Sequence, residues 1–315
     1  MEQPTETKLP TKPAGAESVQ IHDTAPLRWY HVEEPESPVL DQLAQEFGFH
    51  ELEIEDCRHR RHAAKFEEYE NHIFVIVNTL HFVSDTLGVW FGEVAFFVGQ
   101  DFLVTVHLGP TRSVKAVLPR VQTVSKLQRP DRVLHAMTDF MVDRYLPVLD
   151  QLGDRIDRIE DEIHAGPTPK VLEEIFALRR GLAEFRRMVG SMREMVGGLM
   201  RLRAPYYRAD MAAYWRDLYD HIIRALTVIE TYRELLASVL EVYLTATANR
   251  TNEIMKVLTI WATIVLPLVV VTGYFGMNFQ HLPLLESPNG VAFVHIGMIV
   301  LTVGLLIYFR KRHWL

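Results

Sequence analysis

Cysteine and histidine, which often carry chemistry in proteins, gather at one place in the first third of the chain. Cys57, His59 and His62 include ligand types that suit Zn²⁺. The residues that separate them are mostly basic: Arg58, Arg60 and Arg61. Because the spacing matches no recognised zinc site, we favour a solvated basic loop. Cys57, the single cysteine, is expected to be a small, partly buried residue rather than a reactive thiol.

Motifs that would indicate an enzyme are missing from the sequence. It contains no nucleophile elbow, no His-Glu-x-x-His motif and no Gly-rich phosphate loop, so neither catalysis nor ATP as an energy source has support. A membrane-anchored scaffold remains a rival from a different class of function. The net charge of −7 and the isoelectric point near 6.1 argue against a general nucleic-acid-binding protein.

Two long apolar runs lie near the C-terminus. Residues 257–276 include about twenty uncharged residues in succession, and residues 291–309 form a run of about nineteen without Lys, Arg, Asp or Glu. Runs of this length span the hydrocarbon core of a bilayer. Since soluble cores rarely hold two such runs, we expect two membrane-spanning helices rather than two buried core helices.

Charge predicts how these helices are oriented. Arg250 and Lys256 precede the first run, whereas the connecting loop, 278–290, has no Lys or Arg. A basic group follows the second run: Arg310, Lys311, Arg312 and His313. By the positive-inside rule, both termini face the cytosol and the loop lies outside. Because two helices cannot enclose a pore, a conducting path would require several subunits around an axis.

The preceding residues change pattern near residue 131. Runs rich in β-branched and aromatic residues at 72–83, 89–98 and 101–108 predict strands, and residues 38–49 have helical spacing. The later pattern predicts one helix over 131–164 with a kink at Pro147, a second over 170–203, and a stalk of about seventy residues that begins near Tyr206.

The expected fold class is α+β, with a cytosolic α/β domain, a long helical stalk and two C-terminal transmembrane helices. The predicted parts are a disordered tail (1–26), the α/β domain (27–130), a helical hairpin (131–205), the stalk with the first transmembrane helix (206–278), an external loop (279–290), the second transmembrane helix (291–309) and a basic cytosolic end (310–315).

The two helices of the hairpin have opposite charge. The first ends in carboxylates, at Asp150, Asp154, Asp157, Glu160, Asp161 and Glu162. The second carries arginines, at Arg179, Arg180, Arg186, Arg187, Arg193, Arg201 and Arg203. We favour a solvated antiparallel pair with ion pairs between the helices. The alternative is that the acidic end attracts cations.

One face of the first apolar run is small or weakly polar. At about 100° per residue, a helical wheel places these residues on it: Asn252, Met255, Leu258, Thr259, Ala262, Leu266, Val269, Gly273 and Gly276. Bulky residues occupy the opposite face: Ile260, Ile264, Leu268 and Val271. From the residues alone, the small face could pack against another helix or line a pore.

Several stretches resemble the CorA family of magnesium transporters. They are Gly276-Met277-Asn278 at the end of the first span, residues 251–260 at its start, Leu266-Pro267-Leu268 within it, residues 215–221 in the stalk and the basic end 311–315. The resemblance covers residues 27–315. It implies a homopentameric funnel in a bacterial or archaeal inner membrane, in contact with lipid, with the first span lining the pore.

The resemblance also implies roles for individual residues. Gly276, Met277 and Asn278 would form the selectivity filter. Because Mg²⁺ gives up water reluctantly, a ring of Asn278 amide oxygens would accept hydrogen bonds from its hydration shell. Apolar rings would gate the pore by dewetting. The expected pore-lining and gate residues are Asn252, Met255, Leu258, Leu266 and Val269.

Mg²⁺ would be both the transported and the regulatory ion, with no organic cofactor. The resemblance places regulatory carboxylates at Asp217 and Asp85, although Asp85 could equally be an ordinary turn residue. Two charges that move inward gain roughly 4.6 kcal/mol per 100 mV, so the membrane potential suffices as the driving force. Cytosolic Mg²⁺ would close the channel.

The outer loop departs from the family pattern. Gln280 and Leu284 stand where relatives often have acids, and Val269 replaces a hydroxyl that relatives can place on the pore. These departures leave the choice among Mg²⁺, Co²⁺ and Ni²⁺ open. The nearest alternative is a zinc transporter of the same fold, similar to ZntB.

Overall fold

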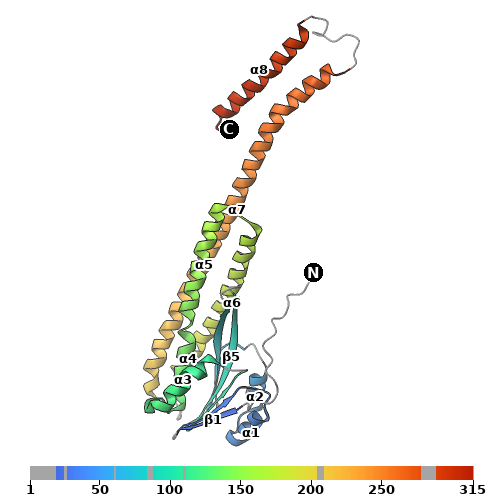
Figure 1. The fold of residues 1–315 in the computed structure, drawn as a ribbon. Helices are drawn as coiled ribbons and strands as arrows, with labels where there is room; N and C mark the ends of the chain where they lie inside the picture. The colour runs from blue at the N-terminus through green and yellow to red at the C-terminus, as the bar shows by residue number, and fades with distance from the viewer. Residues whose placement is uncertain are drawn as a thin grey trace. The chain divides into compact units, whose positions relative to one another are not determined.

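A computed structural model describes residues 19–24, 27–59, 62–83, 88–108, 111–203, 209–277 and 289–314. The chain divides into two compact units. The first comprises residues 1–162 and 168–240, and the second comprises 163–167 and 241–315. The first unit contains a mixed sheet and a helical bundle, and the second contains two apolar helices (Figure 1). The expected α+β class is confirmed.

The sheet of the first unit has six strands in the order β1-β2-β6-β5-β4-β3. β2 and β6 are parallel, and the other neighbouring pairs are antiparallel. The strands are β1 (Val19–Thr24), β2 (Leu27–Val32), β3 (Lys65–Glu68), β4 (Ile73–Val83), β5 (Gly88–Val98) and β6 (Phe102–Val106). At the turn before β6, a Cβ on Gly99 would lie 2.2 Å from the Phe102 ring, so a larger residue would displace that ring.

Three of the strands correspond to predicted runs, and three do not. β4, β5 and β6 lie at the runs that begin near residues 72, 89 and 101, as expected. The prediction of a disordered tail over 1–26 is wrong for Val19–Thr24, because this segment pairs with β2 along its whole length. β2 and β3 were also missed, since both are short and contain several polar residues.

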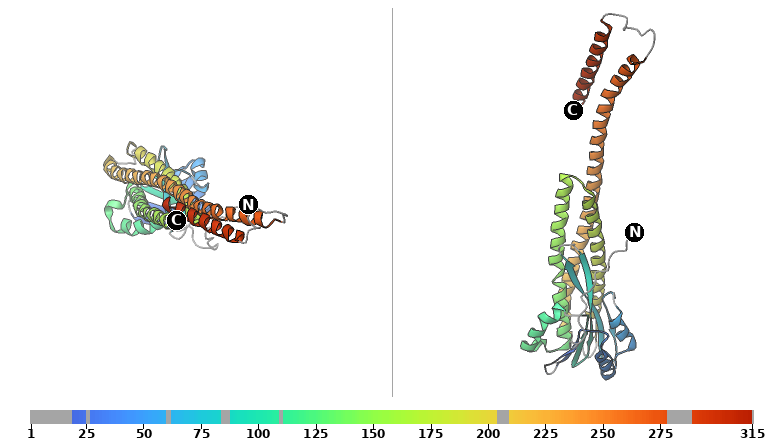
Figure 2. Two further views of the ribbon diagram at one scale, coloured as in Figure 1. Left: turned by 90° about the horizontal axis from the view of Figure 1, so that it is seen from above. Right: turned by 45° about the vertical axis from the view of Figure 1, so that its right-hand side comes forward.

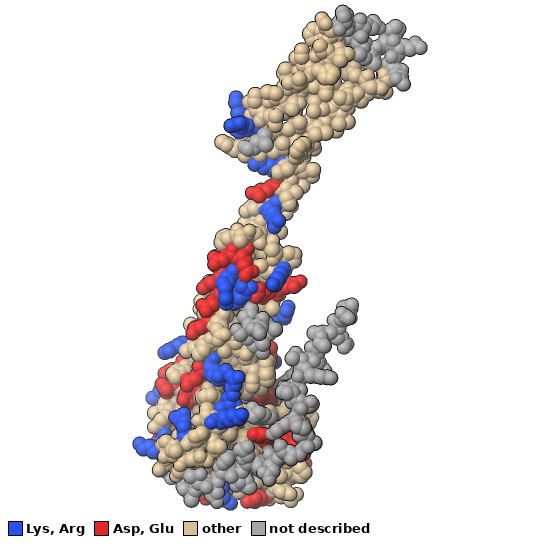
Figure 3. Space-filling view, in the orientation of Figure 1, with Lys and Arg blue, Asp and Glu red and all other residues tan. Residues whose placement is uncertain are grey.

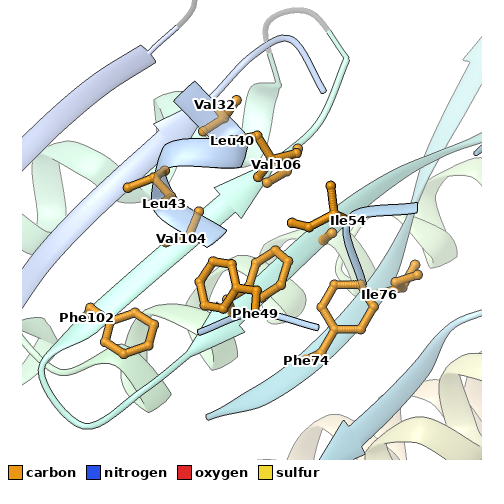
Figure 4. Close-up of a cluster of buried hydrophobic side chains, with 12 residues drawn as sticks. Val32, Leu40, Leu43, Phe49, Ile54, Phe74, Ile76, Phe102, Val104 and Val106 are labelled. Carbon is orange, nitrogen blue, oxygen red and sulfur yellow. The ribbon is translucent and has the colours of Figure 1, made fainter. Parts of the chain in front are cut away.

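Two short helices cover one face of the sheet. α1 (Pro38–Phe47) begins at Ser37, whose side chain accepts a hydrogen bond from the N–H of Val39, and ends at Gly48 with φ 72°. α2 (Glu51–Arg58) follows directly. The core beneath them is apolar (Figure 4): Val32, Leu40, Leu43, Phe49, Ile54, Phe74, Ile76, Ala95, Phe97, Phe102, Val104 and Val106.

The helical bundle contacts the sheet through α4 and α6, both of which lie against β4 and β5. The remaining helices of the first unit are α3 (Arg112–Thr123), α4 (Pro130–Val142), α5 (Tyr145–Ala165), α6 (Pro169–Leu199) and the first part of α7 (Ala212–Phe275), with short 3₁₀ turns at Ser125–Leu127 and Ala209–Met211. Figures 1 and 2 show α5, α6 and this part of α7 side by side. Buried apolar residues at helical spacing, such as Leu178, Leu182 and Phe185 on α6, form the interior of the bundle.

The single helix predicted over 131–164 is two helices. α4 ends at Val142, and α5 begins at Tyr145. Pro147 explains the break, because proline lacks an N–H and its ring clashes with the carbonyl four residues earlier, that of Asp143. Pro147 was therefore correctly identified as an interruption, but the sequence predicted a kink within one helix where the structure has the end of α4 and the start of α5.

The long helix α7 contains 64 residues. It begins at Ala212, a few residues later than predicted, and ends at Phe275. The sequence has no glycine between residues 212 and 272 and one proline, Pro267, so little interrupts the helix. α8 (Gly290–Lys311) is slightly longer at both ends than the run from which it was predicted.

Candidate ion pathway and cation site

The second unit contains two helices whose apolar surface is almost fully exposed. The most apolar window of α7 and that of α8 are each long enough to cross a membrane, and only 6% of each window is buried. The core helix of a soluble protein would be mostly buried instead. Exposure of so much apolar surface therefore supports two membrane-spanning helices.

The contact between α7 and α8 uses the bulky face of α7. Ile260 on α7 is 7% exposed and Phe309 on α8 is 4% exposed, whereas most of their neighbours are exposed. Further along, a shallow apolar pocket of about 220 Å³ lies between the helices and is lined by residues that include Val271, Phe275 and Gly297. Thus Ile260 and Val271, two members of the bulky face, lie toward α8.

The residues predicted to line a pore lie on exposed parts of α7. Leu258 is 60% exposed and Leu266 is 64% exposed, and the same is true of Asn252, Met255 and Val269. The small-residue face of α7 is therefore left uncovered by α8. Pore lining by these residues stays a prediction, because lipid or a helix of another subunit would also fit an uncovered apolar face.

The predicted filter begins where α7 ends. The N–H of Gly276 donates to the carbonyl of Thr272 at 2.9 Å, and the N–H of Met277 donates to the carbonyl of Tyr274 at 3.4 Å. A Cβ on Gly276 would lie 3.1 Å from the Thr272 oxygen, so a larger residue would disturb this last turn. Met277 is half exposed, and Asn278 lies outside the described residues.

Of the two predicted regulatory carboxylates, the structure describes one. Asp217 is exposed on α7, and Asp85 lies outside the described residues. Asp217 is close to a group that sequence reasoning missed: Asp139, Asp143 and His221. One ligand atom from each of these three lies within 4.8 Å of the others, and His221 Nδ1 is 3.8 Å from Asp143 Oδ1.

The electrostatics of this group favour a cation. Burial raises the pKa of Asp139, and the charges of Asp143 and Asp217 raise it further, against the opposite effect of His135 and His221. The raised pKa means that the ionised form of Asp139 is disfavoured here, first by burial and then by the neighbouring carboxylates. Two carboxylates and an imidazole are common ligands of divalent transition metals, and carboxylates also bind Mg²⁺.

The spacing of this group could have been noticed in the sequence. Asp139 and Asp143 are four residues apart, as are Asp217 and His221, so each pair lies on one face of a helix. What the sequence does not show is that the end of α4 lies beside α7. Tertiary packing brings the two pairs together.

The acidic end of α5 is mostly unpaired. In the described part of the chain, Glu162 is its only member in an ion pair, with Arg155 of the same helix. One ion pair does form between α5 and α6, that of Arg155 with Glu174, and neither residue was named in the prediction. Arg186, one of the predicted arginines, pairs with Glu230 of α7 instead. Three of the free carboxylates, Asp150, Asp154 and Asp157, line a pocket of about 270 Å³ beside Tyr232.

The residues of the alternative zinc site have other contacts. His62 lies 3.4 Å from Asp56 and 3.3 Å from Glu93, and His59 lies 3.8 Å from Glu55. Burial and the neighbouring acids Asp56 and Glu53 raise the pKa of the Cys57 thiol, which disfavours the thiolate that Zn²⁺ requires. Within the described ranges, Asp139, Asp143 and His221 are the only group of three or more such side chains with converging ligand atoms.

Comparison with known proteins relates the whole chain to one family. The model of the CorA-like Mg²⁺ transporter protein family matches residues 25–311. The cobalt/magnesium transport protein CorA of Thermotoga maritima is 30% identical over 280 residues, which cover 88% of this chain and 80% of that protein. The protein of the same name from Methanocaldococcus jannaschii is 26% identical over 297 residues, or 92% of each chain.

The fold agrees with this relationship. The complete structure of the CorA magnesium transporter from Methanocaldococcus jannaschii matches with a TM-score of 0.80 over 92% of both chains, at 24% identity. Sequence and fold agree over nearly the whole length, so the chain belongs to the CorA-like Mg²⁺ transporter family.

Proposed function

We propose that this chain is one subunit of a channel that carries hydrated Mg²⁺, with Co²⁺ or Ni²⁺ as further candidate cargoes. Membership of the family makes it a membrane transporter of divalent cations and not an enzyme. The observation that carries the channel proposal is the uncovered face of α7, which is free of carboxylates and ends at Gly276. A pore with such a lining leaves the hydration shell of Mg²⁺ intact.

A homo-oligomer is required by this proposal. Two helices enclose no pore, so the uncovered faces of several copies of α7 would surround a common axis. The family resemblance favours five copies, in a bacterial or archaeal inner membrane with both termini in the cytosol. Membrane lipid would then contact the exposed apolar side chains of α8, of which Ile299 is 62% exposed.

The filter and the gate follow from the chemistry of the side chains. A ring of Asn278 amides would accept hydrogen bonds from the waters of the ion. Met255, Leu258 and Leu266 would form narrow apolar rings, which exclude water when closed. The membrane potential would drive entry, at roughly 2.3 kcal/mol per charge per 100 mV.

We also propose that cytosolic Mg²⁺ closes the channel by binding near Asp217. Asp139, Asp143 and His221 lie close to it, and the raised pKa of Asp139 is the physical support, because a bound cation would relieve the repulsion among these carboxylates. When the cation leaves, the repulsion would loosen this region and favour the open state.

Ion flux into liposomes tests the proposed function. The purified protein, reconstituted with an internal Mg²⁺ indicator, should admit Mg²⁺ when a negative internal potential is imposed. Parallel experiments with Zn²⁺ distinguish a zinc transporter of the same fold, since that protein would carry Zn²⁺ in preference. If none of Mg²⁺, Zn²⁺, Co²⁺ and Ni²⁺ enters under the imposed potential, the channel proposal is wrong.

A further inference from the structure

The C-terminal end of α8 is a defined turn. The N–H of Trp314 donates to the carbonyl of Phe309 at 3.0 Å, and the N–H of His313 donates to that of Arg310 at 3.2 Å. The Trp314 ring stacks on Phe309, with 5.8 Å between the ring centroids. These two hydrogen bonds and the accompanying apolar contact define a Schellman motif, which fixes the positions of the last residues of the helix.

The turn includes a residue in an unfavourable conformation. His313 has φ 55° and is the only non-glycine residue with positive φ in the described ranges. A residue with a Cβ is disfavoured in this left-handed region, because the Cβ lies too close to the backbone carbonyl oxygen. The Nζ of Lys256 on α7 donates to the carbonyl of His313 at 3.1 Å, so a contact with the neighbouring helix holds the turn in place.

The turn gathers positive charge. Arg310 and Lys311 belong to the last turn of α8, Arg312 caps it, and Lys256 reaches it from α7. Figure 3 shows Lys and Arg side chains at one end of a mostly uncharged surface formed by the apolar part of α7 and by α8. Among the described residues, none of the four forms an ion pair with a carboxylate. The turn therefore places four basic side chains together at this end of α8.

Topology and the helix dipole explain only part of this arrangement. Basic residues at a cytosolic helix end orient the helix in the membrane, and they interact favourably with its C-terminal carbonyls. Neither effect requires Lys256 to contact the turn of the other helix. Neither requires Trp314, an amphipathic side chain typical of the membrane interface, to be fixed beside the charges.

We propose that Lys256, Arg310, Lys311 and Arg312 bind the phosphate of an anionic phospholipid in the cytosolic leaflet, with Trp314 against its glycerol region. Ammonium and guanidinium groups are the usual partners of phosphate, and basic groups at the cytosolic end of membrane helices attract anionic headgroups. The site requires that α8 spans a membrane, but it does not require that the chain transports cations.

Two substitutions at His313 test whether lipid binding requires the geometry of this turn or only its positive charge. Glycine adopts φ near 55° readily, whereas a β-branched residue does not, and neither change alters Lys256 or the arginines. Full-length protein in neutral detergent is titrated with phosphatidylglycerol or phosphatidylcholine, and bound lipid is counted by native mass spectrometry. His313→Gly should bind phosphatidylglycerol with the same affinity as the parent protein. His313→Val should bind it at least about fivefold more weakly, because loss of the turn would displace at least one of the basic side chains from the phosphate. Equal affinity of the two variants would overturn the proposal.

Charge substitutions test the same site without altering the turn sequence. Lys256→Gln should weaken phosphatidylglycerol binding about fivefold, and removal of Arg310, Lys311 and Arg312 together should weaken it on the order of a hundredfold. The control replaces three exposed arginines of α6, Arg179, Arg180 and Arg187, by glutamine and should change nothing. Size-exclusion chromatography verifies that each variant assembles.

Two further results would contradict the proposal. If phosphatidylcholine binds as tightly as phosphatidylglycerol, the charges do not select the ligand. If inorganic phosphate displaces phosphatidylglycerol at a comparable concentration, the site binds free phosphate rather than lipid. We expect lipid to bind far more tightly, because Trp314 and the apolar end of α8 add contacts that inorganic phosphate cannot make.

Discussion

At the level of single residues, the proposed filter would recognise the ion through hydrogen bonds to its bound water rather than through charge. The amide oxygen of Asn278 would accept hydrogen bonds from the hydration shell of the ion, while the carboxylates of the chain lie outside the membrane segments. Asp139, Asp143 and His221 would instead bind a cation directly. These two kinds of recognition lead to separate predictions.

Replacement of Asn278 by alanine should reduce Mg²⁺ flux at least about tenfold while the oligomer still assembles. The reason is that each hydrogen bond to a charged species contributes roughly 1.5–3 kcal/mol. Flux into proteoliposomes measures the effect, and size-exclusion chromatography verifies assembly. Gln280→Ala removes a second amide two residues later and serves as the control, with flux close to that of the parent. Near-normal flux in Asn278→Ala would exclude its role in the filter.

Asp139→Asn should raise the melting temperature of the cation-free protein at pH 7. Because the folded pKa of Asp139 is raised by burial and by Asp143, the folded protein loses stability as the pH rises through that pKa. Asparagine removes this loss, so the two proteins should converge below about pH 3, where the carboxyl is largely protonated in both the folded and the unfolded state.

The same variant tests the cation site. Mg²⁺ should stabilise the parent protein and should stabilise Asp139→Asn much less, in thermal unfolding at pH 7 with and without the ion. Asp161→Asn, which removes an exposed carboxylate at the end of α5, should behave like the parent. If Mg²⁺ stabilises all three proteins equally, these residues do not bind it.

Among the elements, α7 has two different faces, and only one is covered by α8. Ile260 is buried at the seam, whereas Leu258, two residues earlier, is exposed. Successive positions on a helix differ by about 100°, so residues two apart point in very different directions. The two faces can therefore be tested by neighbouring substitutions.

Leu258→Ser should produce a channel that leaks when cytosolic Mg²⁺ would otherwise close it. A hydroxyl lowers the cost of wetting an apolar constriction, so water and ions could pass the closed gate. Flux at millimolar internal Mg²⁺ measures the leak. Ile260→Ser is the matched control and should impair packing or assembly without a resting leak. Equal leaks from both variants would mean that the pore face is wrongly assigned.

Prediction from sequence succeeded best for elements with strong local signals. The two apolar runs lie in the C-terminal part of α7 and in α8, and the β-branched runs correspond to β4, β5 and β6. β1 and β3 were missed because their polar residues gain stability mainly from pairing with β2 and β4, which a local pattern does not reveal. Ion pairs between α5 and α6 were expected, but the partners depend on helix register, and the pair that forms, Arg155 with Glu174, was not foreseen.

For the molecule as a whole, one helix carries both the proposed sensor and the proposed gate. Asp217, His221 and Leu258 all belong to α7. The sequence predicted the continuous helix, and the family resemblance suggested a regulatory role for Asp217, which stays a prediction. The sequence could not predict that Asp139 and Asp143 lie close to this part of α7. Coupling between cytosolic Mg²⁺ and the pore is therefore a property to be tested in the intact oligomer.

Asp217→Ala should weaken closure by Mg²⁺ in that oligomer. The loss of one carboxylate near the cation site should raise the internal Mg²⁺ concentration for half-inhibition roughly fivefold or more. Flux should therefore persist at millimolar internal Mg²⁺, where the parent is silent. Glu234→Ala removes an exposed charge from the same helix and should leave the inhibition curve unchanged. Unchanged inhibition in Asp217→Ala would place the sensor elsewhere.

Cys57 has a practical consequence for such experiments. It is the single cysteine of the chain, and burial raises its thiol pKa, so it should react slowly with maleimides and methanethiosulfonates near neutral pH. A second cysteine placed at an exposed position of α7, such as Val269, would then be labelled almost alone. Spin or fluorescent probes could follow the movement of that helix without prior removal of native thiols.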